Sequence, residues 1–335
     1  TGVVVGHSTY LHRGQANLIQ HQVVVDQTVD MLAQMQPELT PEQLEDIRKK
    51  MTAKLPQFNA DVGPSLVPNV MTGRIANRLN LKGPNYLVDA ACSSSLLAVG
   101  AAMDELNNHR SDMMIAGGVN ASLPPEVNVI FTQLGALSRR GKVRPFEAGS
   151  DGTLLGEGLG MVVLKRLEDA LASGDRVYAV IRGVGQASDG KGAGLLAPSQ
   201  DGELLAMQRA YEQTGIDPAS VAMIEAHGTG IPLGDQTEIG ALSTLLGERD
   251  RPMGSVALGS VKSMISHCIP AAGIAGLIKA ALSLHHRVLP PSLHCQQPHP
   301  LLAQTRFRVI GAAEPWDGPR VAAVNAFGFG GINAH

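Results

Sequence analysis

Cys92 stands where a protein could place a nucleophile. It lies in VDAACSSSLLAVGAAMDEL, in which an extended segment runs into a turn of small residues and then into an amphipathic helix. Unpaired N–H groups and the positive end of the helix dipole lower the pKa of a cysteine in this position and favour its thiolate. The setting therefore predicts a nucleophile, whereas a cysteine without it is more often a buried structural residue.

Two histidines each follow a predicted strand. His227 lies in EAHGTG, just after an apolar run that ends at Glu225, and His267 lies in SVKSMISH, five positions after Lys262. A single histidine of this kind is more often a satisfied core or loop residue. Because α/β sheets gather functional groups beyond their strand ends, we expect these two histidines to share one crevice.

A glycine-rich turn, NAFGFGGINAH, occupies the last positions of the sequence. It follows the last predicted strand and no helix follows it, so it does not fit a dinucleotide-binding fingerprint. A backbone turn around Phe329 and Gly330 that points N–H groups at an oxyanion fits better.

Two other histidine groups carry weaker signals. His285 and His286 end a predicted helix, where a cation suits the dipole. His294, Cys295 and His299 in HCQQPHP do not make a full ligand set, so we expect no metal there.

The segments around these residues predict a layered α/β protein. Short apolar runs alternate with helical patterns, which is typical of helices packed on buried sheets. The predicted strands are 3–5, 86–89, 113–119, 160–165, 177–184, 221–226, 257–261, 307–310 and 321–325. The predicted helices are 23–34, 41–55, 64–80, 92–108, 203–214, 235–246 and 271–285.

Composition narrows the class of protein. The 335 residues, 44% apolar and 17% charged, can bury a sizeable core. A net charge of −3 with scattered Lys and Arg speaks against a nucleic-acid partner. Three cysteines without CxxC spacing indicate neither a disulfide framework nor a zinc ribbon and favour a reducing cytoplasm. No apolar run is long enough to predict a membrane span.

The four motifs that hold Cys92, His227, His267 and Phe329 resemble, in this order, motifs of the ketosynthase domains of polyketide and fatty-acid synthases. The patterns of that family are DTACSSSL, EAHGTGT, KSNIGH and GFGGTNAH. The stretch RPFEAGSDGTLLGEGLG (144–160) looks like the PFDAxADGxxxGEG segment of that family. The run LIKAALSLHH and the early VVVDQTVD are similar to type I iterative synthases of polyunsaturated fatty acids, enediynes and heterocyst-type glycolipids. Gly276 stands where stand-alone fatty-acid enzymes usually carry Glu.

The resemblance implies a thiolase-like fold, an α/β protein of two similar βαβ-rich halves in an αβαβα layered arrangement. One ketosynthase domain would span 1–335. Its N-terminal half, about 1–165, would hold the nucleophile, and its C-terminal half, 166–335, both catalytic histidines. The family's opening strand is missing, so we expect the chain to be truncated at both ends. In this fold the strand at 85–89 lies at a sheet edge and pairs with its symmetry mate in a homodimer.

The resemblance also implies a β-ketoacyl synthase, an acyltransferase that catalyses decarboxylative Claisen condensation without a bound cofactor or metal. Cys92 would hold the acyl chain, and the backbone N–H groups of Cys92 and Phe329 would hold the oxyanion. Neutral His227 and His267 would stabilise the enolate as Nε2–H donors, and Lys262 would position the loop of His267.

The substrates would arrive on the phosphopantetheine of an acyl carrier protein, in acyl and malonyl forms. Thr229, Phe329 and Gly330 would contact the pantetheine arm. Ile231 and Ile332 stand where the family usually has Thr, so only Thr229 carries over from the HGTGT threonines. Further partners would be other domains of a multidomain synthase.

Three alternatives stay open. A decarboxylase or acyltransferase on the same fold would need only part of the reaction, although the presence of both histidines disfavours it. A non-catalytic partner such as a chain-length factor usually lacks the cysteine. A Cys–His hydrolase would use one orienting Asn or Asp instead of a second His.

Overall fold

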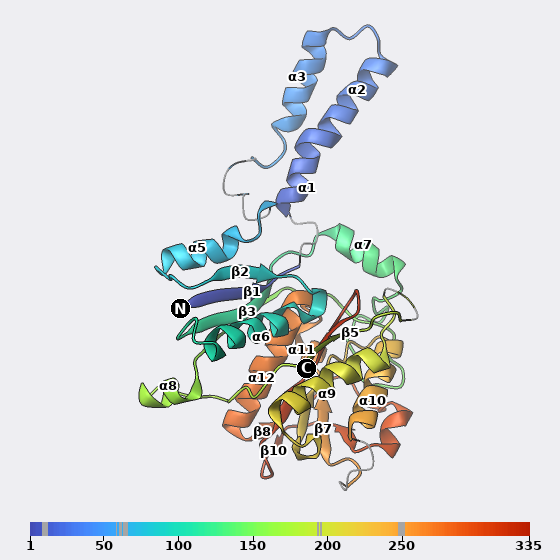
Figure 1. Cartoon of the computed structure of the whole chain (residues 1–335). Coiled ribbons are helices and arrows are strands. Elements are labelled where there is room, and N and C mark those ends of the chain that lie inside the picture. The colour runs from blue at the N-terminus through green and yellow to red at the C-terminus, as the bar shows by residue number, and fades with distance from the viewer. Residues whose placement is uncertain are drawn as a thin grey trace.

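A computed structural model describes residues 1–8, 13–57, 59, 62, 66–192, 194, 196–246 and 252–335. Two four-stranded sheets form its frame (Figure 1). The first has the order β2-β1-β3-β4, in which β4 alone runs antiparallel to its neighbour. Its strands are β1 (Gly2–Gly6), β2 (Asn85–Val88), β3 (Met114–Asn120) and β4 (Gly158–Leu164).

The second sheet is parallel throughout, with the order β11-β6-β7-β9. Its strands are β6 (Met223–Glu225), β7 (Val256–Gly259), β9 (Phe307–Val309) and β11 (Ala322–Val324). Every residue of β6 and β7 is buried, as expected for parallel strands covered on both faces.

Two helices, α6 (Ser94–Asn107) and α12 (Ala272–His286), form the layer between the sheets. The helix α6 packs on β1 and β3, while α12 contacts strands of both sheets. Small residues allow the two helices to approach closely: a Cβ at Gly273 would lie 2.7 Å from Leu96 Cγ. This contact sets the spacing between α6 and α12.

Outer helices complete the αβαβα arrangement that the family resemblance implied. On the first sheet lies α5 (Val70–Arg78), against β1 and β2. The helices α9 (Gln200–Thr214) and α10 (Pro232–Leu246) pack on each other, and α10 shares an apolar core with the second sheet. The division of the chain into halves at 165/166 remains a prediction.

A helical arm, α1 (Arg13–Ile19), a π-helical stretch (Gln20–Val24), α2 (Val25–Met35) and α3 (Pro41–Thr52), projects from the body (Figure 1). Pro41 begins α3 as predicted, and Thr40 and Gln43 form a capping box in front of it. The helix buries no residue, in agreement with its charged sequence.

The remaining elements are short: α7 (Pro125–Gln133), α8 (Leu167–Ala172), α11 (Lys262–Ile265), and the strands β5 (Gln186–Ser188), β8 (Val288–Leu289), β10 (Glu314–Pro315), β12 (Ala326–Gly328) and β13 (Ile332–Ala334). The strands β12, β13 and β5 form a three-stranded antiparallel sheet. Within the described part of the chain, no helix has the length and apolar character needed to cross a membrane.

Most predicted strands are found within one or two residues, but the strand predicted at 177–184 is wrong. Its residues join no strand pair in the described structure, and only 186–188 nearby join a sheet. Ile181 and Val184 pack on the apolar cluster around α6. The apolar pattern of this segment therefore reflects the packing of its side chains and not strand pairing. The helix predicted at 64–80 begins at Val70, and residues 64 and 65 lie outside the described part. The helices α1, α7 and α8 were not predicted.

Candidate active site

Cys92 lies in a tight 3₁₀ turn, Ala91–Ser93, that joins β2 to α6. The turn is tied to the glycine-rich hairpin β12–β13, because Ser93 Oγ donates to the carbonyls of Ala326 (2.7 Å) and Ile332 (2.9 Å). Ala91 has a φ of 47°, the left-handed conformation that turns the chain sharply before the thiol. The small, hydroxyl-rich sequence ACSSS therefore holds the thiol under Phe329 of the hairpin.

His267 is held by the main chain. Its N–H donates to Leu154 O (2.8 Å), and its carbonyl accepts from Gly156 N (3.0 Å). Both residues belong to the 144–160 segment that matched the family pattern. The ring Nε2 lies 3.1 Å from Cys92 Sγ. This contact joins two of the predicted site residues directly.

His227 is held by a buried carboxylate. Its N–H donates to Glu238 Oε1 and the N–H of Gly228 donates to Glu238 Oε2, both at 2.8 Å. Asn325 Nδ2 also donates to Glu238 Oε1 (2.8 Å). The rings of His227 and His267 lie edge to face, with centroids 5.5 Å apart.

Backbone donors fix the tautomer of both rings. Phe327 N–H donates to His227 Nδ1, and Ile269 N–H donates to His267 Nδ1, each at 3.3 Å. A nitrogen that accepts a hydrogen bond carries no proton, so the ring proton of each neutral histidine lies on Nε2. Both rings therefore present an N–H donor to the space beside the thiol.

Both histidines are neutral, as predicted. Burial lowers the pKa of His227 well below its ordinary value, and Lys262 and His267 lower it further. Burial and Lys262 likewise lower the pKa of His267. Neither ring takes a second proton at neutral pH.

The prediction that helix position lowers the pKa of Cys92 is wrong. Burial raises this pKa to about 11, because the thiol is almost fully buried, while Lys262 and the backbone N–H groups of Phe329 and Cys92 oppose the rise. The turn before α6 provides too little positive field to outweigh desolvation. Cys92 is thus a thiol at rest, surrounded by donors that stabilise a thiolate once it forms.

Lys262 links the two histidine loops. It begins α11 on the His267 side, and its buried ammonium donates to the carbonyl of His227. Burial lowers its pKa, and the carboxylates of Glu225 and Glu238 oppose this. A positive charge at this point favours thiolate at Cys92 and neutral imidazole at both histidines.

Cys92, His227 and His267 each offer one donor atom, and these atoms lie within 4.8 Å of one another. A metal would need a free lone pair on Nε2, with Nδ1 donating to an acceptor. Here both Nδ1 atoms accept from backbone N–H groups, which leaves Nε2 protonated. These residues therefore fit a developing oxyanion better than a cation.

The thiol also borders an apolar cluster suited to an alkyl chain. Cys92 groups with Val127 and Phe131 of α7, and the ring centroids of Phe131 and Phe329 are 5.5 Å apart. Thr229 is buried and its Oγ1 accepts from Ile231 N (3.3 Å), whereas Gly330 is exposed in the hairpin turn. The pantetheine contacts predicted for Thr229, Phe329 and Gly330 stay a prediction.

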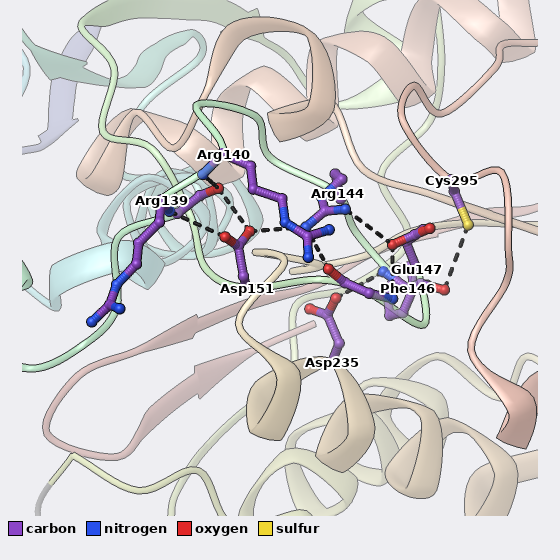
Figure 2. Close-up of polar contacts among 10 residues, drawn as sticks. Arg139, Arg140, Arg144, Phe146, Glu147, Asp151, Asp235 and Cys295 are labelled. Atoms are coloured by element: carbon purple, nitrogen blue, oxygen red, sulfur yellow. Dashed lines mark hydrogen bonds and ion pairs between the residues drawn. The ribbon is translucent and has the colours of Figure 1, made fainter.

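A second polar network supports the His227 loop from outside. Figure 2 shows Asp151 with Arg144, and Asp235 with the backbone of Phe146. Asp235 also accepts from Gly230 N (3.1 Å). Burial raises the pKa of Asp235 to about 7, against the hydrogen bond from Phe146. The network joins the 144–160 segment to the HGTG loop.

The weaker sequence candidates lie elsewhere. The thiol of Cys295 donates to Phe146 O at 3.5 Å (Figure 2), and its loop packs on 146–148. His299 Nδ1 accepts from Leu301 N, and His285 packs on the ring of Tyr178. Within the described residues, His294, Cys295 and His299 do not group as metal ligands.

Sequence reasoning missed four buried polar residues that hold the site: Glu225, Asp235, Glu238 and Asn325. Glu225 accepts from Val261 N (2.5 Å) and forms an ion pair with Lys279 (2.7 Å). One signal was available, because Asp235 and Glu238 stand three positions apart among the buried apolar residues of α10. Carboxylates on the apolar face of a helix need partners.

Known proteins resemble this chain both in sequence and in structure. The profile of the β-ketoacyl synthase N-terminal domain matches residues 26–170, and that of the C-terminal domain matches residues 178–296. One protein of the phenolphthiocerol/phthiocerol polyketide synthase of Mycobacterium bovis is 44% identical over 273 residues, 80% of this chain and 14% of that protein. One protein of the polyunsaturated fatty acid synthase of Thraustochytrium sp. is 39% identical over 308 residues, 87% of this chain and 11% of that protein.

The solved structure of the PfaC keto synthase–chain length factor is 34% identical, with a TM-score of 0.87 over 100% of this chain and 35% of that chain. The chain spans only a small part of the length of the curated relatives it matches. The two profiles together cover most of the chain, including Cys92, His227 and His267. The chain thus belongs to the β-ketoacyl synthase family and has its thiolase-like fold.

Proposed function

We propose that this chain joins an acyl chain to a malonyl unit by decarboxylative Claisen condensation, with Cys92 as the nucleophile. One observation carries the proposal: the sulfur of Cys92 and two Nε2–H donors of neutral histidines converge on one small space beside an apolar cluster. Condensation needs a nucleophile for the acyl group and N–H donors for an enolate, and this space offers both.

In the loading step, the sulfur of Cys92 attacks the acyl thioester of a carrier protein, the bond between the acyl carbon and the carrier sulfur breaks, and the proton of the Cys92 thiol passes to the carrier sulfur, which leaves as a thiol. The backbone N–H groups of Cys92 and Phe329 stabilise the oxyanion of the tetrahedral intermediate. Lys262 stabilises the thiolate while it exists. The apolar side chains of α7 shelter the acyl chain from water.

In the elongation step, malonyl carrier protein replaces the first carrier. Loss of carbon dioxide leaves an electron pair on the α-carbon as an enolate, whose oxygen accepts from His227 and His267. The α-carbon then attacks the acyl carbonyl, a carbon–carbon bond forms, and the sulfur of Cys92 leaves. Neutral donors suit this step, because an imidazolium would protonate the enolate instead of holding it.

We further propose that acyl carrier protein and neighbouring synthase domains are partners, and that two copies pair through β2. This strand is the edge of its sheet, and an exposed edge offers unpaired N–H and C=O groups to a second copy. Light scattering at micromolar concentration tests the pairing, and a stable, active monomer would refute it.

Intact-protein mass spectrometry tests the reaction. Cys92→Ala should not take an acyl group from its carrier protein, whereas Cys268→Ala and Cys295→Ala, the matched controls, should load like the parent. His227→Ala and His267→Ala should load but lose condensation with malonyl carrier protein. Acyl groups on the Cys92→Ala protein, or condensation at the parental rate in either histidine variant, would overturn the assignment.

A further inference from the structure

His335, the last residue of the glycine-rich motif, has no role in the reaction proposed above, yet it is buried beside the His227 loop. Its Nδ1 lies 2.5 Å from Asn325 Oδ1, and its Nε2 lies 3.0 Å from the hydroxyl of Tyr211 on α9. Asn325 in turn donates to Glu238, which holds the N–H of His227.

The chemistry of each group allows only one direction of hydrogen bonding. Asn325 uses its Nδ2–H for Glu238, so its Oδ1 must accept, and His335 must donate to it from Nδ1. The Nε2 of a neutral His335 then accepts, and Tyr211 must donate. The chain of donors therefore runs from Tyr211 through His335 and Asn325 to Glu238.

Two groups are held in the protonation states that this direction requires. Burial lowers the pKa of His335 to about 4, which keeps the ring neutral. Burial raises the pKa of the Tyr211 phenol, which keeps its proton. Burial also raises the pKa of Glu238, while the donors Gly228, Asn325 and His227 oppose this rise and favour the carboxylate.

We propose that His335 is a positioning residue for His227: its Nδ1–H fixes the side-chain amide of Asn325, so that Asn325 can donate only to Glu238. Without this donor the amide can rotate and present its oxygen to the carboxylate. Glu238 would then turn away and release the N–H groups of His227 and Gly228. The inference rests on the proposed role of His227 in condensation and assigns no contact between His335 and substrate.

The test compares three variants in the chain of donors from Tyr211 to Glu238 with one control. His335→Ala removes both hydrogen bonds, His335→Asn keeps an amide N–H where Nδ1 was, and Tyr211→Phe removes only the outer donor. The matched control is His285→Ala, because His285 packs on Tyr178 with centroids 4.9 Å apart, almost as His335 packs on Tyr211 at 5.1 Å.

Condensation with malonyl carrier protein should fall about tenfold or more in His335→Ala, whereas loading of Cys92 changes less than about threefold, since the turn that holds the thiol is fixed by other contacts. His335→Asn should recover condensation to within about threefold of the parent, and Tyr211→Phe should lose about twofold. His285→Ala should match the parent in both steps. Equal loss of loading and condensation in His335→Ala, or no recovery in His335→Asn, would overturn the proposal.

Nuclear magnetic resonance of ¹⁵N-histidine gives a second readout that does not depend on activity. In the parent, the Nε2–H tautomer of His227 should give one sharp pair of ring signals. In His335→Ala these signals should shift or broaden while those of His267 stay in place, and in His335→Asn they should return. Unchanged His227 signals in His335→Ala would overturn the positioning role of His335. This readout is separate from the proposed function, because the signals can be compared even if the parent protein does not catalyse condensation. If His335→Ala does not fold, His335→Asn and Tyr211→Phe still decide by the same signals.

Discussion

The loops that carry His227 and His267 both present a neutral ring with its proton on Nε2, but different contacts fix their backbones. Both rings are neutral and protonated on Nε2, although His267 is buried and His227 is half-buried. The backbone of His267 is fixed by main-chain hydrogen bonds to 154–156, whereas the backbone of His227 is fixed by the side chain of Glu238. The position of His267 is thus part of the fold, while that of His227 depends on the charge and orientation of a few side chains.

This difference predicts where substitutions act. On the His267 side, only a change that moves the backbone should matter. On the His227 side, an isosteric substitution that changes only charge or hydrogen bonding should be enough to reduce condensation.

Glu238→Gln should reduce condensation about 100-fold, because the new NH₂ group cannot accept from backbone N–H and the His227 loop must move. Loading of Cys92 should fall far less. Single-turnover rates of acyl transfer and of condensation measure the two steps separately. The control is Gln236→Ala, an exposed neighbour on α10. If Glu238→Gln condensed like the parent, the side-chain account of the His227 loop would fail.

Gly156→Ala should reduce condensation about tenfold and loading of Cys92 less, since a Cβ there would lie 2.7 Å from Ile265 O and would displace the 154–156 segment that bonds the backbone of His267. Gly311→Ala is the control, because a Cβ at Gly311 meets no atom within 4 Å. Single-turnover rates of condensation in both variants give the comparison. Condensation at the parental rate in Gly156→Ala would show that the main-chain bonds to 154–156 do not set the position of His267.

Lys262→Met should slow alkylation of Cys92 by iodoacetamide, by about tenfold for each unit that the thiol pKa rises. In the parent, the pKa of about 11 means that the thiolate fraction, and hence the rate, should increase about tenfold per pH unit from pH 7 to 10. The positive charge of Lys262 lowers this pKa, so its removal raises it. Faster alkylation in Lys262→Met, at constant pH, would contradict the assigned electrostatics.

Glu203→Gln should leave both reaction steps unchanged and should stabilise the protein at alkaline pH. Burial raises the pKa of Glu203 to about 10, with Glu238 and Asp189 adding to the rise. The folded state therefore holds a proton that the unfolded state releases above its ordinary pKa of 4.5, and stability falls as pH rises between these values.

Keeping Glu203 protonated at pH 7.5 lowers the free energy of unfolding by up to about 4 kcal/mol. The uncharged side chain of Gln removes this loss. Urea unfolding at pH 5 and pH 8 should show a gain that is larger at pH 8. Glu212→Gln, an exposed position on the same helix, is the control. A gain that does not depend on pH would mean that Glu203 is ionised in the folded protein.

The sequence by itself determined the local features of this protein. The alternation of apolar runs and helical patterns predicted the layered α/β class, because side-chain periodicity follows from backbone geometry. The motifs placed Cys92, His227 and His267 at the ends of strands, where α/β proteins gather functional groups. Pro41 marked the start of α3, since the preference of proline for the first turn of a helix is a local property of the chain.

Only the tertiary structure decided the properties that depend on distant residues. The pKa of Cys92 follows from burial by Phe329 and α7, so the local helix argument gave the wrong direction. The segment 177–184 is apolar enough for a strand, but it pairs with no strand in the described part of the chain. In the sequence, His335 looks like an ordinary polar residue, and the one signal at Glu238 is its place among the apolar residues of α10. Their roles arise because the second sheet brings α9, α10 and the glycine-rich hairpin around His227, 108 positions before His335.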